Sequence, residues 1–132
     1  MSHIARIFIS VPLQDGAPAS LDDAQAKYLT RVMRLGEEAT VRVFNGEDGE
    51  WICSLQVSGK KVAVVPVRQT RQQVQSLNLT LFFAPLKKTR TDFIIEKATE
   101  LGVRSICPVF TEYTQATRTR ADRMRLLAIE AA

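Results

Sequence analysis

The residues with the clearest capacity for chemistry are a group of cations that follow an apolar run. Lys87, Lys88 and Arg90 are three cations within four residues, directly after the apolar segment 77–86. The spacing predicts a helix over 91–101, so these cations lie at its N-terminus. Backbone N–H groups and the helix dipole favour phosphate there, and cations add to this attraction. The pattern predicts a phosphate-binding site; the alternative is a solvated loop whose cations happen to cluster.

Further cations are spread over the first half of the chain. Arg31 and Arg34 are three residues apart, so a helix would direct both side chains to one side. Arg6 faces away from the apolar side of the first predicted strand, and Lys60 and Lys61 lie at the tip of a turn. Each of them alone is typical of an ordinary surface charge. Together they could line a surface that follows a phosphate backbone. Arg118 and Arg120, after a later strand, form a weaker candidate group.

Composition limits the class of protein. The 132 residues are 45% hydrophobic and 24% charged, with a net charge of +4, as expected for a soluble globular protein. We expect no membrane segment, because no apolar run approaches the roughly 20 residues that a spanning helix needs. Cys53 and Cys107 lie far apart without a CxxC partner, so we expect neither a disulfide framework nor a metal site. The absence of a secretory signal pattern favours the cytoplasm.

The first part of the chain is predicted to form short strands separated by tight turns. Apolar residues alternate in the strands, Asn45-Gly46 marks a hairpin, and Pro66 indicates a sheet edge or a bulge. One helix is expected to begin at the N-cap Ser20 and to stop near Gly36. This organisation favours a small antiparallel β-barrel. The expected strands cover 4–11, 40–45, 51–57 and 62–67.

After a polar linker at 69–76 the pattern changes. The run 77–86 is typical of a strand buried on both faces of a parallel sheet, and 105–111 is a second such strand. Helices are expected over 91–101 and 121–132, and the apolar face of the first comprises Ile94, Ala98 and Leu101. The order β-α-β-α predicts a right-handed parallel α/β unit.

We therefore expect two domains, a complete barrel over 1–73 and an incomplete α/β unit over 74–132. The first domain has nine basic and eight acidic residues, and the second domain has nine basic and six acidic residues. Two parallel strands are too few for a sheet covered on both faces, and the last helix ends without a capping signal. The sequence is thus predicted to stop within a domain. The alternative is that a symmetric partner completes the sheet.

Four segments together resemble the bacterial 16S ribosomal RNA (uracil-N3)-methyltransferases of the SPOUT class. The most specific is 87–103, KKTRTDFIIEKATELGV, which is similar to the family block K-x-x-R-x-[DE]-x-x-[IL]-x-K-A-x-E-L-G-V. Supporting segments are Arg6-Ile7-Phe8, the run YLTRVMRL at 28–35, and Phe44-Asn45-Gly46 with Lys60-Lys61. The segment 106–112 is also similar to the family's next strand.

The resemblance implies a PUA-like RNA-binding barrel followed by an α/β domain that ends in a trefoil knot. In that family the knot binds S-adenosylmethionine, usually at a Gly-Pro-Glu-Gly-Gly segment and a later Leu-Arg-x-Glu-Thr segment, and neither occurs in this sequence. We therefore expect no cofactor-binding residues in this chain. By itself, the 132-residue chain is expected to be inactive. The full-length protein is expected to be a homodimer.

The activity that the resemblance implies is methylation of uracil N3 in 16S rRNA, free or within the small ribosomal subunit. Arg90 and Lys88 are weak catalytic candidates that could stabilise the negative charge of the deprotonated uracil. No general base is assigned. The alternative is a non-enzymatic RNA-binding module or a ribosome assembly factor. The residues expected to bind RNA are Arg6, Arg31, Arg34, Lys60, Lys61, Lys87, Lys88 and Arg90.

Overall fold

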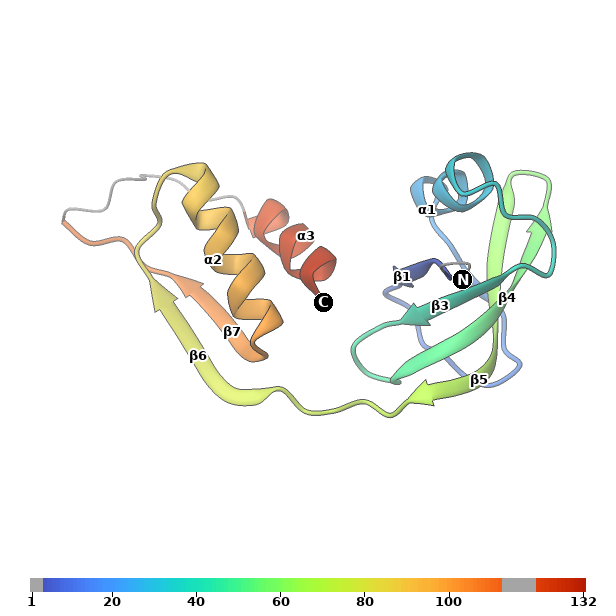
Figure 1. Cartoon of the computed structure of the whole chain (residues 1–132), viewed down its shortest axis with the longest axis horizontal. Helices are drawn as coiled ribbons and strands as arrows, with labels where there is room; N and C mark the ends of the chain where they lie inside the picture. Colours follow the sequence, from blue (N-terminus) through green and yellow to red (C-terminus); the bar gives the residue numbers. More distant parts are fainter. Residues whose placement is uncertain (1–3, 113–120) are drawn as a thin grey trace. The chain divides into compact units, whose positions relative to one another are not determined.

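A computed structural model describes residues 4–112 and 121–132 and shows two compact units, Met1–Val74 and Gln75–Ala132 (Figure 1). Within the described residues, no helix combines the length and the apolar character needed to cross a membrane. Each unit has its own sheet and its own buried residues, so the two are described separately.

The first unit is a curled five-stranded sheet with a short helical segment, which confirms the predicted fold class. The strand order is β1-β3-β4-β5-β2, and every neighbouring pair is antiparallel except β1 and β3, which are parallel. The sequence pattern did not predict that parallel pair. The elements are β1 (Arg6–Phe8), β2 (Ala19–Ser20), α1 (Asp23–Lys27), the π-helix η1 (Tyr28–Val32), β3 (Thr40–Phe44), β4 (Glu50–Ser58) and β5 (Lys61–Arg71).

The core of this unit is built from alternate residues of its strands. Successive strand side chains point to opposite faces, so every second residue can be buried against the helical segment. Leu29 of η1 has no exposed surface and belongs to the same core cluster. The predicted alternation is therefore confirmed at its centre. The buried apolar strand residues of this unit are Ile7, Ala19, Val41, Val43, Cys53, Leu55, Val62, Val64 and Pro66.

Three local predictions for this unit need correction. The helix begins after Asp22 rather than Ser20, because the Asp22 carboxylate accepts a hydrogen bond from the Gln25 N–H at 2.7 Å. The first strand covers only Arg6–Phe8. The predicted linker starts too early, because β5 extends to Arg71 by pairing with β4. The bulge expected near Pro66 is confirmed by a register shift between Ile52 and Cys53.

A buried carboxylate ties the start of the unit to its two longest strands. Glu50 is 5% exposed, and its carboxylate accepts hydrogen bonds from Arg6 Nε at 2.7 Å and from Thr70 Oγ1 at 3.1 Å. The Arg6 guanidinium lies 4.0 Å from the centre of the Phe44 ring. Burial alone would raise the pKa of Glu50, but these hydrogen bonds and the Arg6 charge hold that pKa below its ordinary value. The ionised carboxylate is thus stabilised in the folded unit.

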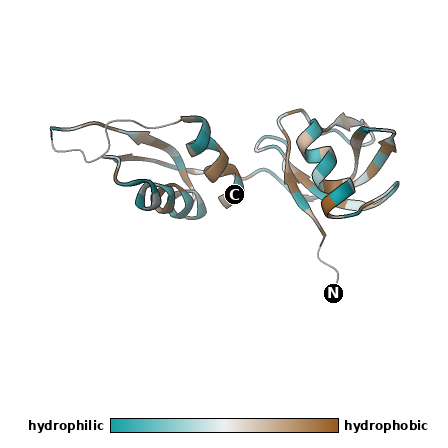
Figure 2. Cartoon of the chain, turned by 90° about the horizontal axis from the view of Figure 1, so that it is seen from above, coloured by the Kyte–Doolittle hydropathy of each residue, from teal (hydrophilic) through white to brown (hydrophobic). Residues whose placement is uncertain are grey.

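The second unit is a pair of parallel strands with two helices. Its elements are β6 (Leu77–Phe83), α2 (Lys88–Glu100), β7 (Val103–Pro108) and α3 (Ala121–Ala131), and β6 pairs with β7 in parallel. The predicted order of elements is confirmed. An ion pair of 2.7 Å between Asp92 and Arg123 joins the two helices. Figure 2 shows apolar colour along the strands and hydrophilic colour on turns of α2.

The burial predicted for this second unit was wrong in two respects. Leu77 and Phe82 of β6 are 60% and 65% exposed, so this strand is not buried on both faces, because the described residues supply only a two-stranded sheet. The buried side of α2 comprises Thr91, Ile95 and Ala98, whereas Leu101 is 75% exposed. The three buried residues are spaced by four and then three positions, so they still lie on one face of the helix.

We expect Glu50→Gln to destabilise the first unit by about 2 kcal/mol at neutral pH, because a charged hydrogen-bond acceptor is lost from a buried position. The folded-state pKa of Glu50 is lowered, so its contribution is present above the ordinary value of 4.5 and is lost as the pH falls below it. Urea unfolding followed by the fluorescence of Trp51, which lies in this unit, measures both effects at neutral and acidic pH.

The matched control is Glu47→Gln, an exposed carboxylate in the neighbouring turn. This control should leave the midpoint of unfolding unchanged. Equal acid sensitivity of the Glu50→Gln variant and the unaltered chain would contradict the role given to Glu50.

Candidate nucleic-acid interface

The cationic group predicted after the apolar run lies where β6 leads into α2. Lys87 is the N-cap of α2, and Lys88 and Arg90 follow in its first turn. All three side chains are exposed, and none forms an ion pair with another described residue. The N-cap side chain makes no capping hydrogen bond, so the first-turn N–H groups of Lys88 and Thr89 keep no partner among the described residues. Positive charge and free donors therefore coincide at the carboxyl end of a parallel strand.

Thr91 holds this cationic loop in place. Its hydroxyl donates to the carbonyl of Leu86 and accepts from the N–H of Leu86, both at 3.0 Å. Thr91 is 9% exposed, and Pro85 just before the loop is fully buried. The loop is thus anchored on both sides of Leu86 while the cations stay in solvent. Sequence reasoning missed Thr91; its place in the first helical turn, where hydroxyl side chains bond to nearby backbone, could have indicated it.

A second group of cations surrounds a groove on the first unit, between the helical segment and the β4–β5 turn. The groove has a volume of about 410 Å³, and its lining includes three cations, Lys27, Arg31 and Lys60, and one acidic residue, Asp23. A neighbouring hollow of about 350 Å³ is lined by Lys60, Lys61 and the hydroxyl-bearing Ser20, among others. The structure therefore brings Arg31, Lys60 and Lys61 together across separate elements. Sequence reasoning missed Lys27, which follows the helical spacing of i, i+4 with Arg31.

The predicted helical alignment of Arg31 and Arg34 was wrong. Arg31 lies on η1, but Arg34 lies beyond the end of η1 with φ = +55°. A left-handed residue does not continue the helix, so the two side chains do not follow helical spacing. Both side chains are exposed and have no ion-pair partner among the described residues. Arg34 does not line either of the two hollows just described.

Other cations form ion pairs with acidic residues of the same unit. Arg6 bonds to Glu50 and stacks on Phe44, so the structure places it in an internal network rather than beside Lys60 or Arg31. Lys97 pairs with Glu100 at 3.2 Å and with Glu96 at 3.6 Å on the same helix. Arg118 and Arg120 lie outside the described residues. The exposed cations without partners are thus a smaller set than the sequence alone indicates.

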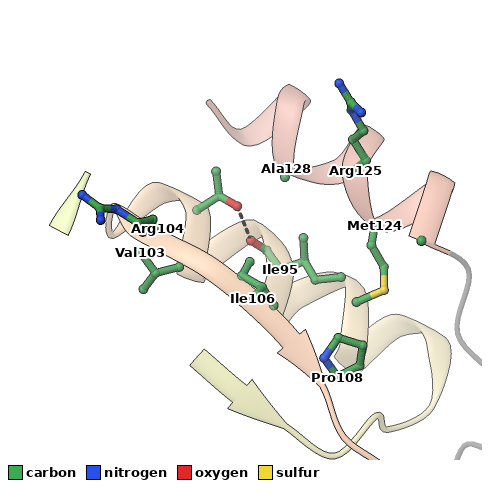
Figure 3. Close-up of a pocket in the computed structure, with 10 residues that line it drawn as sticks. Ile95, Val103, Arg104, Ile106, Pro108, Met124, Arg125 and Ala128 are labelled. Atoms are coloured by element: carbon green, nitrogen blue, oxygen red, sulfur yellow. Dashed lines mark hydrogen bonds between the residues drawn. The ribbon is translucent and has the colours of Figure 1, made fainter. Parts of the chain in front are cut away.

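A third cavity lies in the second unit, between α2, β7 and α3 (Figure 3). Its volume is about 410 Å³, and Met124 extends from α3 toward Ile95 and Pro108. The guanidinium groups of Arg104 and Arg125 are at its rim and point away from it. Among the described residues that line this cavity there is no carboxylate, so they offer no anionic partner for the amino and sulfonium cations of S-adenosylmethionine.

Two family models match the chain. The model for the RNA methyltransferase PUA domain matches residues 21–67, and the model for the RNA methyltransferase domain matches residues 73–132. The first match lies within the first unit, and the second match covers the whole second unit and the two residues before it.

Similar proteins with curated names are ribosomal RNA small subunit methyltransferases E. The protein from Rickettsia conorii is 30% identical over 128 residues, which cover 96% of this chain and 52% of that protein. The protein from Buchnera aphidicola subsp. Schizaphis graminum is 27% identical over 113 residues, with 84% and 46% covered. The chain spans about half the length of the curated relatives it matches.

Solved structures with a similar fold are also described as RNA methyltransferases. A crystal structure of ribosomal RNA small subunit methyltransferase E from Neisseria gonorrhoeae, bound to S-adenosyl methionine, matches with a TM-score of 0.79 and 27% identity. That match covers 98% of this chain and 55% of the other. A protein from Thermotoga maritima described as a predicted RNA methyltransferase matches with a TM-score of 0.78 and 26% identity, covering 97% and 59%.

We expect Thr91→Val to loosen the cationic loop. The substitution keeps the shape of the side chain but removes both hydrogen bonds to Leu86, each worth about 1 kcal/mol. Amide hydrogen exchange should show faster exchange at Leu86, with a smaller change in the β4–β5 region of the other unit. Thr91→Ser, which retains the hydroxyl, should restore slow exchange. The matched control is Thr89→Val, an exposed threonine of the same turn. Unaltered exchange at Leu86 in Thr91→Val would contradict the anchoring role.

Proposed function

The chain belongs to the RNA methyltransferases that join a PUA domain to a methyltransferase domain, and from this we propose that it supplies the RNA-docking part of a 16S rRNA (uracil-N3)-methyltransferase. The observation that carries the proposal is the exposed group Lys87, Lys88 and Arg90 at the end of a parallel strand. Ligands of open α/β sheets bind at this edge, and phosphate suits a helix N-terminus with free N–H groups.

In this proposal both units contact the phosphate backbone of the RNA. On the second unit the contacts come from Lys87, Lys88 and Arg90. On the first unit they come from the groove cations Arg31, Lys60 and Lys61, with Lys27 added by the structure. Phosphate contacts fix the register of the RNA without reading its sequence. Arg34 is an additional exposed cation close in sequence to Arg31, whereas the guanidinium of Arg6 serves the fold.

The chemical role proposed for the second unit concerns the charge on uracil. Methylation at N3 requires loss of the N3 proton, which leaves negative charge on the ring and its carbonyl oxygens. Lys88 and Arg90 carry exposed positive charge that would lower the cost of this anion if the base is held beside α2. No described residue is assigned as the base. S-adenosylmethionine is the proposed methyl donor of the whole protein, and no step is assigned to it in the α2–β7–α3 cavity.

The partners proposed for the whole protein follow the names of its relatives. We propose 16S rRNA, free or within the small ribosomal subunit, as the substrate, a homodimer as the assembly and the cytoplasm as the location. The substrate is supported by relatives named ribosomal RNA small subunit methyltransferase E. The homodimer rests on the family resemblance alone, and the cytoplasm rests on the sequence pattern alone. The finer choice of uracil N3 rests on the resemblance of segment 87–103.

A second candidate function is a non-enzymatic RNA-binding module that assists ribosome assembly. One observation favours it: cations suited to RNA lie on the described residues, whereas the described lining of the cavity in the second unit holds no carboxylate for the cations of the cofactor. Both candidates require binding of RNA. They differ in whether the full-length protein transfers a methyl group.

The RNA-docking role predicts salt-dependent binding of a 16S rRNA fragment to this chain. Replacing Lys87, Lys88 and Arg90 together by Gln should weaken binding at least tenfold at moderate salt. The slope of log K against log salt should become less steep by about 2 to 3, near 0.7 to 0.9 for each lost contact. Fluorescence anisotropy over a salt series measures both quantities.

Arg104→Gln is the matched control. Arg104 is an exposed cation of the same unit, but it lies near the start of β7. Because β6 and β7 are parallel, that is the end of the sheet opposite to the cationic loop, which follows the carboxyl end of β6. This control should change the affinity less than twofold. Equal losses in the triple variant and the control would refute the proposed site.

The enzymatic part predicts that the full-length protein transfers a labelled methyl group from S-adenosylmethionine to 16S rRNA, with 3-methyluridine as the product. Mass spectrometry of digested RNA identifies that nucleoside. Calorimetry with the 132-residue chain alone should show no micromolar binding of S-adenosylmethionine. Transfer to another base or position would refute the uracil-N3 proposal, and absence of any transfer would favour the binding module.

A further inference from the structure

The π-helix η1 ends in a left-handed turn that is occupied by an arginine. The N–H of Met33 donates to the carbonyl of Tyr28 at 2.9 Å, and the N–H of Leu35 donates to the carbonyl of Leu29 at 2.9 Å. Between them Arg34 has φ = +55°. The second bond joins residues six positions apart, one more than the corresponding bond of an ordinary α-helix end, because it closes a π-helix. The left-handed residue still stands just before the donor, as it does at many helix ends. Glycine is the residue that usually occupies this position.

An arginine is a costly choice for this conformation. A side chain with a Cβ is disfavoured at positive φ, and only a few per cent of such residues adopt it. A glycine is close by, but Gly36 has a φ outside the left-handed range, so it does not serve this turn. The backbone at residue 34 would therefore be accommodated more easily by glycine. Whatever the arginine contributes must come from its side chain.

That side chain is not used by the described fold. Arg34 is exposed and has no hydrogen bond or ion pair with the described residues. The neighbouring carboxylate of Glu37 accepts a hydrogen bond from the N–H of Val57 at 2.6 Å. Arg31, on the preceding π-helix, is also exposed and unpaired within the described residues. Two unneutralised cations thus flank the end of η1.

We propose that Arg34 is a phosphate-binding residue of the first unit, and that its strained turn is kept for the charge it presents rather than for stability. The inference rests on the proposed RNA docking and gives the expected contact of Arg34 a structural reason. Strained residues cluster at binding sites, and π-helices are frequent there. The ligand is an RNA phosphodiester, for which arginine provides several N–H donors in one plane.

The test compares stability and RNA affinity in the same variants of the chain. Arg34→Gly should raise the melting temperature of the first unit by a few degrees, because the left-handed conformation suits glycine. The same variant should bind the 16S rRNA fragment about three- to tenfold more weakly, with a salt slope less steep by about 0.7 to 0.9. Arg34→Asn, which tolerates positive φ without charge, should lose affinity equally. If Arg34 had only a structural role, its replacement by glycine would not raise the melting temperature and at the same time weaken binding of the 16S rRNA fragment.

Glu38 provides the matched control because it also has positive φ, at +63°, but carries the opposite charge. Glu38→Gly should raise the melting temperature without weakening RNA binding. An Arg34→Gly variant with unchanged affinity, or with a lower melting temperature, would overturn the proposal. If the triple variant of Lys87, Lys88 and Arg90 still weakens binding in that case, RNA docking stands and only the role of Arg34 fails. If the unaltered chain shows no salt-dependent binding, RNA docking itself fails.

Discussion

The cationic site of the second unit depends on the pair of hydrogen bonds between the Thr91 hydroxyl and the backbone of Leu86. A loop between a strand and a helix would otherwise fluctuate, and its cations would repel one another. The Thr91 hydroxyl bonds both the N–H and the carbonyl of Leu86 and so holds the loop in place. The three cations stay exposed, and the N–H groups of Lys88 and Thr89 stay without a partner among the described residues. Preorganised charge of this kind binds phosphate at a smaller entropic cost than a mobile loop.

Internal pairing separates the cations that maintain the fold from those that are free to bind. Arg6 with Glu50 and Arg123 with Asp92 join elements within the two units. Lys97 is paired along its own helix. The exposed cations of the 87–90 loop and of the groove on the first unit have no such partner among the described residues. A modest net charge can therefore coexist with two local sites of positive potential.

The sequence predicted the elements well where one physical rule dominates. Alternation located β3 and β4, and the cations of 87–90 were placed at the start of α2 as expected. Prediction from the sequence failed where tertiary pairing competes with local preference: polar Gln69 and Arg71 pair with β4, and the end of η1 turns left-handed at Arg34. The groove could not be predicted, because it brings Lys27 and Arg31 close to Lys60 across distant segments. Thr91 was missed because its role depends on the path of the backbone.

The central claim is that RNA contacts the cationic loop of the second unit and the groove of the first. Ultraviolet cross-linking of the chain to a 16S rRNA fragment, followed by mass spectrometry of the peptides, tests it most directly. We expect cross-linked peptides from 27–34, from 60–61 and from 86–93, and none from the start of β7 around Arg104. Cross-links confined to β7, or spread evenly over the exposed cations, would contradict the account.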